Sequence, residues 1–294
     1  MYRQYDASSI NDIPVEVFYK ELARYQPLVN NAKEAFADPK TGMAPGMMGL
    51  TAEDMQNFYS QLPKRLESVI WLEQDGKTGY EQAQAIAQKK FDAVQKPFTY
   101  SFGVSSDAMD YQTLLSLLLT LLCAVIAAPV FASDAQTGAQ DIQLCTKNGG
   151  LRLAAAKLAA AFSITGAAYL LCGVVWILVT NALFGWESTQ TSVQWLFSVT
   201  SLLPYTVGQM EWVMLVANFL IFFAEVAFVL MASVWAKNNL TALSVALISV
   251  VAPLIVYMVV PGSFGEWLST LIPAGGIGLS NALLYKICLL YTSP

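Results

Sequence analysis

The sequence predicts an all-α membrane protein, a polytopic helix bundle preceded by a helical extracytoplasmic domain. Two observations predict this class. Hydrophobic residues make up 55% of the 294 residues and charged residues only 13%, whereas charged residues make up roughly a quarter of a soluble domain. In addition, 26 of the 37 charged residues lie in the first 110 positions. We therefore expect a soluble region at 1–110 and a membrane region at 111–294.

Four long apolar stretches predict the spanning helices. Each provides the roughly 20 apolar residues that a helix needs to cross a bilayer. They lie at about 111–132, 158–184, 212–236 and 240–261. The segment 267–294 is interrupted by Pro273 and a glycine cluster, so it is expected to be incomplete. It could be an outer-face helix, a re-entrant piece or the start of another span.

Residues 1–110 contain three stretches whose apolar residues recur near the helical period. They are 13–36, 50–73 and 78–98, and glycine-containing loops separate them. Thr51 precedes the second stretch and Asp54 follows three positions later, which is a partial capping signal. The outer region is therefore expected to be helical.

The composition excludes several classes of function. A net charge of −5 without a basic stripe excludes nucleic acid as a partner, because clustered lysine and arginine are needed to bind phosphates. The chain has no histidine, which removes the usual base of hydrolytic sites and a common zinc ligand. The four cysteines show no CxxC spacing, and no GxxxxGK(S/T) motif is present to hold ATP phosphates. We therefore predict no catalytic residue, metal or cofactor in this chain.

The distribution of lysine and arginine over the short connections predicts the orientation. The connection 133–157 carries three such residues, and the tight turn before the fourth span carries Lys237. The connection 185–210 carries none. The connection 133–157 and the turn at Lys237 are therefore expected in the cytoplasm, and residues 1–110 are expected outside. The protein would be a multi-pass protein of the plasma membrane.

The connection 133–157 is longer than two neighbouring spans require. Gly138 lies near its beginning, the helix breaker Asn148-Gly149-Gly150 lies in its middle, and its second half is basic. This pattern predicts two short helices that meet at a bend, a shape suited to docking a partner.

These residues resemble the permease subunits of ABC exporters of the second export class. In that family the cytoplasmic loop between the second and third spans carries an acidic residue, a glycine, a basic residue after a glycine, and a lysine that opens the next span. The ATPase-coupling residues that the resemblance implies here are Asp134, Gly138, Asp141, Gly150, Arg152 and Lys157. The chain departs from the family in having aspartate where glutamate is usual.

The resemblance implies one half of a dimeric export pathway, completed by a second permease half that is identical or different. It also implies a separate ABC ATPase subunit docked on the loop, so that ATP hydrolysis resides on a partner chain and this chain is not an enzyme. Membrane lipid is the third expected partner, and the substrate stays open between a peptide, an antibiotic-like molecule and a lipid. The four spans would be the second to the fifth, so the chain is expected to be a fragment that lacks the first span and most of the last.

A second interpretation is a membrane-anchored sensor or scaffold without transport activity. Its helical outer domain would bind a ligand, and the loop 133–157 would signal to a cytoplasmic partner. Co-purification with an ATPase separates the two interpretations. A membrane-embedded hydrolase is disfavoured, because the chain lacks histidine and paired intramembrane carboxylates.

Glu225 is a carboxyl near the middle of the third span, where a charge costs about 2.5–3.5 kcal/mol on insertion scales. It is interpreted either as a polar contact on the substrate path or a gate, or as a protonated structural carboxyl. In the structural case it would be bonded to Asn181, Asn218 or a backbone carbonyl. These three side chains form the predicted intramembrane polar site.

The connection 185–210 contains Trp186 and Trp195 beside an apolar run. Aromatic side chains of this kind gather at membrane surfaces. We therefore expect an interfacial helix anchored by an aromatic belt, with a gate element as the alternative.

Overall fold

A computed structural model describes residues 13–46, 50–74, 79–103, 106–260 and 263–278. Over these residues the chain is helical, apart from loops and one isolated β-bridge. The all-α class predicted from the sequence is therefore confirmed. The described chain divides into two compact units. The first contains residues up to 108 together with 180–210, and the second contains 109–179 together with residues from 211 onward.

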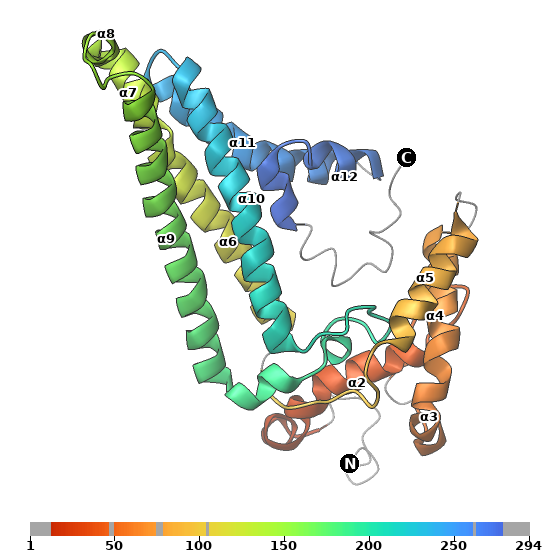
Figure 1. The fold of residues 1–294 in the computed structure, drawn as a ribbon. Coiled ribbons are helices and arrows are strands. Elements are labelled where there is room, and N and C mark those ends of the chain that lie inside the picture. The colour runs from red at the N-terminus through yellow and green to blue at the C-terminus, as the bar shows by residue number, and fades with distance from the viewer. Residues whose placement is uncertain (1–12, 47–49, 75–78, 104–105, 261–262, 279–294) are drawn as a thin grey trace. The chain divides into compact units, whose positions relative to one another are not determined.

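Among the described residues, four helices are long and apolar enough to cross a membrane (Figure 1). They are α6 (Ser106–Ala127), α9 (Leu151–Phe184), α10 (Val207–Trp235) and α11 (Asn239–Val259). Each coincides with a predicted span, and the chain is a multi-span helical membrane protein. α9 has 34 residues, which corresponds to about 51 Å and exceeds the roughly 30 Å hydrocarbon core. The excess explains why α9 begins before its predicted span, with turns that carry Arg152 and Lys157.

The bundle in the second unit is packed around small side chains. Ala124 and Ala128 from the first span, and Ala246 from α11, are fully buried. Small residues let helix backbones approach closely, which is the usual basis of helix packing in lipid. Between them, the rings of Tyr169 and Phe222 stack with their centroids 4.4 Å apart.

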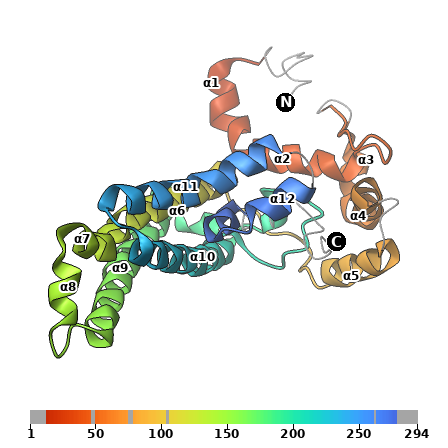
Figure 2. The ribbon, with the colours of Figure 1, turned by 90° about the horizontal axis from the view of Figure 1, so that it is seen from above.

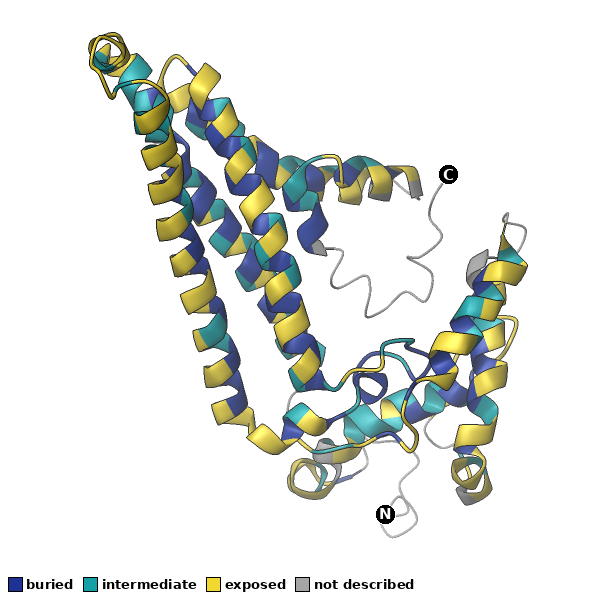
Figure 3. Ribbon diagram, in the orientation of Figure 1, coloured by how far each residue is buried: buried dark blue, intermediate teal, exposed yellow. Residues whose placement is uncertain are grey.

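The opposite faces of the same helices expose large apolar side chains. Figure 3 shows exposed residues alternating with buried ones along α9 and α10. Leu122, Ile164, Leu171 and Leu220 are exposed members of these faces. Such continuous apolar exposure is unusual in water but is what a lipid-facing surface requires.

The first unit contains shorter helices. They are α1 (Val15–Val17), α2 (Gln26–Ala32), α3 (Ala52–Gln56), α4 (Phe58–Gln74) and α5 (Tyr80–Asp92). The three predicted helical stretches are confirmed as helical, although the first is divided by a π-helical turn at 18–22 and 3-10 turns at 23–25 and 33–36. The capping signal is complete, because Thr51 and Asp54 each bind the other's backbone amide.

The connection 185–210 does not form the predicted interfacial helix. It consists of two 3-10 turns, Trp186–Gln190 and Val193–Trp195, joined by extended chain. Trp186 is 55% exposed but Trp195 only 6%, so an anchoring role for both is wrong. The Trp195 ring stacks on Phe58 at 5.2 Å, and its Nε1 donates to the Phe98 carbonyl at 3.1 Å. Trp195 is buried because its indole completes the aromatic core of the first unit.

The segment after α11 returns to the bundle. It contains α12 (Ser263–Ser269) and a 3-10 turn at Pro273–Gly278. A Cβ atom built on Gly275 would lie 3.0 Å from the Pro253 Cβ, and Pro253 lies six residues before the end of α11, or about 9 Å along it. The described part therefore packs back against α11, and residues 279–294 lie outside the described residues.

Candidate functional site

The loop predicted to couple to an ATPase is built from two short helices. α7 (Pro129–Thr137) continues the first span, and α8 (Ala139–Leu144) follows it. The bend between them lies at Gly138, whose φ of +70° favours glycine. The predicted pair of helices is thus present, but the bend lies at Gly138, and Asn148-Gly149-Gly150 instead forms the turn into α9. Figures 1 and 2 both show α8 beside the beginning of α9.

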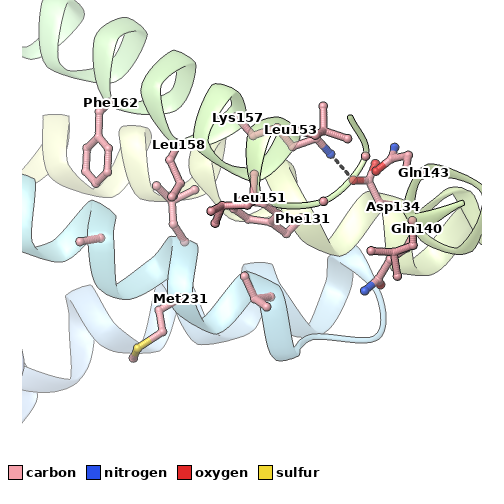
Figure 4. Close-up of a pocket in the computed structure, with 17 residues that line it drawn as sticks. Phe131, Asp134, Gln140, Gln143, Leu151, Leu153, Lys157, Leu158, Phe162 and Met231 are labelled. Carbon is pink, nitrogen blue, oxygen red and sulfur yellow. Dashed lines mark hydrogen bonds and ion pairs between the residues drawn. The ribbon is translucent and has the colours of Figure 1, made fainter. Parts of the chain in front are cut away.

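An ion pair ties α7 to α9. The Lys157 ammonium pairs with the Asp134 carboxylate and also donates to the Val130 carbonyl at 3.3 Å (Figure 4). The same ammonium lies 5.7 Å from the centroid of the Phe131 ring. The resemblance singled out Asp134 and Lys157 separately, and the structure brings them together across 23 residues. Both side chains are partly buried, so water screens the pair less than a fully exposed one.

Two polar side chains, Ser233 and Gln136, connect the α7 region to α10 and α11. The Ser233 hydroxyl of α10 accepts the Phe131 and Ala132 amides at 3.1 and 3.0 Å and donates to the Ala128 carbonyl at 2.5 Å. These backbone groups surround Pro129, which has no amide to donate. The Asn239 amide at the start of α11 donates to the Gln136 side chain at 2.9 Å. A lone serine or glutamine carries no distinctive sequence signal, so sequence reasoning missed both.

The remaining predicted loop residues are exposed. Asp141 lies on α8 without burial, and Arg152 reaches Asn148 at 3.4 Å. Gly150 has open space around it, whereas a Cβ on Gly149 would lie 1.5 Å from the Gln143 carbonyl oxygen. The steric requirement for glycine therefore lies at Gly149, one position before the residue that the resemblance selected.

Glu225 is fully buried in the second unit. One carboxyl oxygen lies 2.5 Å from the Ser249 hydroxyl, and the other accepts the Ala274 amide at 3.1 Å. These two partners differ from those expected from the sequence, which were Asn181, Asn218 or a backbone carbonyl. Asn218 is directed instead at the Ser116 hydroxyl, 3.4 Å away.

Asn218 and Glu225 have different neighbours within the second unit. Asn181 belongs to the first unit, whereas Glu225 and Asn218 belong to the second. Within the second unit, Asn218 faces α6, and Glu225 faces α11 and the segment that follows it.

The hydrogen bonds favour a neutral Glu225. The Ser249 hydroxyl also lies 2.9 Å from the Ala246 carbonyl, and a hydroxyl has only one proton to donate. A protonated Glu225 donates to Ser249, Ser249 donates to Ala246, and the second carboxyl oxygen accepts from Ala274. A carboxylate would require the single Ser249 proton to serve two acceptors. The arrangement thus satisfies a backbone amide that would otherwise lack a partner at membrane depth.

Over the residues that the structure describes, no cluster of three or more His, Cys, Asp or Glu side chains could hold a metal ion. Comparison with protein-family models, curated proteins and solved structures finds no significant match to the chain. The structure therefore establishes a multi-span helical membrane protein, and a more specific function rests on the geometry of these sites.

Proposed function

We propose that the chain is the permease subunit of an ATP-driven ABC exporter, forming one half of a translocation pathway. Hydrolysis would occur on a separate ATPase subunit that docks on α8. The observation that carries the proposal is the attachment of the α7–α8 element to α9, α10 and α11 through Lys157, Ser233 and Asn239.

These attachments suit the transmission of force. α7 is continuous with the first span apart from the break at Ala128. A displacement of α8 would therefore reach the ends of all four spans instead of being absorbed in a loose loop. Rigid-body movement of docked helices is a common way of converting a partner's closure into rearrangement of a membrane bundle.

The exposed surface of α8 supports a partner there. Ile142 is 72% exposed and Leu144 62% exposed, on a short helix between polar residues. Leu144 lies two positions after Ile142 and so on another side of α8, where it lines a cavity. Ile142 is therefore the residue that fits the apolar centre of a contact with a polar rim. The positive-inside distribution supports a cytoplasmic position for this end, where an ATPase has access to nucleotide.

The test is co-purification. The chain, expressed with its neighbouring genes and purified in detergent, should elute with ATP hydrolysis activity. Ile142→Glu should reduce that activity strongly, because it places a charge in an apolar contact. Val15→Glu is the matched control, since Val15 is a similarly exposed apolar residue of the first unit. An intact, monodisperse chain that elutes without ATPase activity would contradict the proposal and favour the sensor or scaffold.

A further inference from the structure

A cavity of about 700 Å³ lies within the second unit, between α8, the beginning of α9 and the end of α10 (Figure 4). Its volume falls in the range of sites that bind small molecules. The coupling role proposed above assigns the exposed Ile142 of α8 to the partner, and Ile142 does not line this cavity, although the Asp134–Lys157 pair belongs to both.

The wall of the cavity changes from polar to apolar along the helix axes. Asp134, Gln140, Gln143 and Lys157 line the end near α8, and Phe162 lines the opposite end (Figure 4). Phe162 lies eleven residues into α9 from Leu151, about 16 Å at the helical rise. The span predicted from the sequence begins near residue 158, so Phe162 lies only about 6 Å inside it. The cavity therefore lies where the α8 end of the bundle enters the hydrocarbon core, within one leaflet.

The polar end suits a phosphate group. An ammonium has three donors, and the Lys157 contacts with Asp134 and Val130 use two of them. Further exposed cations belong to the connections at this end of the bundle, namely Lys147, Arg152 and Lys237. Basic residues at a membrane surface attract anionic phospholipid headgroups.

The apolar end suits an acyl chain better than a protein segment. Leu158, Phe162, Ala227, Leu230 and Met231 form this part of the wall, and their side chains offer no hydrogen bond. A peptide inserted there would leave backbone amides and carbonyls unsatisfied, at a cost of several kcal/mol for each group in hydrocarbon. An acyl chain has no such groups.

We propose that this cavity binds one membrane phospholipid, with an acyl chain along Leu158, Phe162 and Met231 and its phosphate at Lys157. The lipid belongs to the leaflet at the α8 end of the bundle. The site shares the Asp134–Lys157 pair with the proposed coupling to an ATPase, but lipid binding requires only the second unit and a bilayer.

The test is native mass spectrometry of the full chain in detergent, titrated with a phosphatidylglycerol of defined acyl chains. Ala227→Trp and Met231→Trp each fill the apolar part of the cavity from α10. Ala224→Trp is the matched control, because Ala224 is also exposed on α10 but does not line the cavity. We expect each filling variant to bind the lipid about tenfold more weakly, since burial of about two methylene groups is lost. The control should bind like the parent chain.

A diacylglycerol with the same acyl chains tests the headgroup contact, and it should bind more weakly because it lacks phosphate. Equal binding of both lipids would overturn the assignment, as would displacement of the phospholipid by inorganic phosphate alone. Equal behaviour of all three tryptophan variants would show non-specific lipid around the bundle and would also overturn it. If the filling variants lost a co-eluting ATPase but kept the lipid, the cavity would belong to the protein partner instead.

Discussion

A cluster of three aromatic rings that includes Trp195 lies in the core of the first unit, whereas small side chains occupy many of the helix contacts in the second, beside the stacked rings of Tyr169 and Phe222. In the first, the rings of Phe58, Phe98 and Trp195 lie with centroids 5.2–6.4 Å apart. In the second, fully buried alanines such as Ala124 and Ala246 occupy the helix contacts, and polar side chains such as Gln112 and Glu225 are buried beside them.

This difference follows from the surroundings of each unit. The sequence predicts that residues 1–110 lie in water, where burying a large apolar side chain is the main favourable contribution to folding. In a bilayer the lipid is as apolar as the protein interior, so helices associate through close packing and hydrogen bonds. The same kind of substitution should therefore have different effects in the two units.

The largest effect is expected for Trp195→Ala in the first unit. Truncating a buried tryptophan costs about 3–5 kcal/mol through lost burial and the cavity left behind. Near-ultraviolet circular dichroism with increasing denaturant would report the loss of this aromatic cluster. Trp186→Ala, at the exposed tryptophan of the same connection, should leave the transition unchanged. Equal effects of both substitutions would contradict the packing described here.

In the second unit, enlarging a small residue should be the damaging change. Ala246→Leu is expected to destabilise the bundle by about 1–3 kcal/mol, because overpacking pushes helices apart. Ala167→Leu, on an exposed face of α9, should have little effect. The two variants are compared by the fraction of monodisperse protein that remains after heating in detergent. A larger loss of monodisperse protein for Ala167→Leu than for Ala246→Leu would contradict the small-residue contacts.

Glu225 tests the role of buried hydrogen bonds in the second unit. Glu225→Ala leaves the Ala274 amide unsatisfied, which costs about 1–3 kcal/mol. Amide hydrogen exchange of 270–278 should therefore accelerate. Glu225→Gln should preserve slow exchange, since its amide can donate to Ser249 while its carbonyl accepts from Ala274. Rapid exchange in Glu225→Gln would show that the carboxyl acts as an anion.

The smallest effect concerns the capping box of α3. Hydrogen bonds from the Thr51 hydroxyl and amide hold the pKa of Asp54 below its ordinary value of 3.8. The capping box therefore stabilises α3 fully at pH values above the ordinary pKa of Asp54. This stabilisation is lost as the pH falls through the lower pKa that Asp54 has in the folded protein. Hydrogen exchange of 52–56 should become faster over that acidic window, and Thr51→Ala should weaken the dependence. A pH-independent exchange rate, corrected for intrinsic exchange, would be inconsistent with the capping role.

The spans could be predicted because a long apolar stretch has few structures available in a bilayer other than a helix. The long-range hydrogen-bond partners of Glu225 could not be predicted in this way. Ser249 and Ala274 lie 24 and 49 residues from Glu225, and a serine or alanine in an apolar segment gives no local sign of such a contact. Asparagines do stand out among apolar residues, which is why the sequence points to them and not to Ser249 or Ala274.

The prediction for Trp195 failed for a related reason. An aromatic residue in a short connection between spans gives the same local signal whether it lies at the membrane surface or completes a protein core. Only the contact with Phe58, far away in the sequence, distinguishes the two. By contrast, Asp134 and Lys157 were selected individually through the family pattern, and their pairing emerged from the fold.

The most direct test of the coupling account exchanges the charges of the ion pair. ATP hydrolysis that co-elutes with the purified chain would be measured for Asp134→Lys, for Lys157→Asp and for the double variant. We predict a several-fold loss in each single variant, because like charges then separate α7 from α9, and recovery of most of the activity when both are exchanged. Unchanged activity in the single variants, or no recovery in the double variant, would contradict a coupling role for this pair.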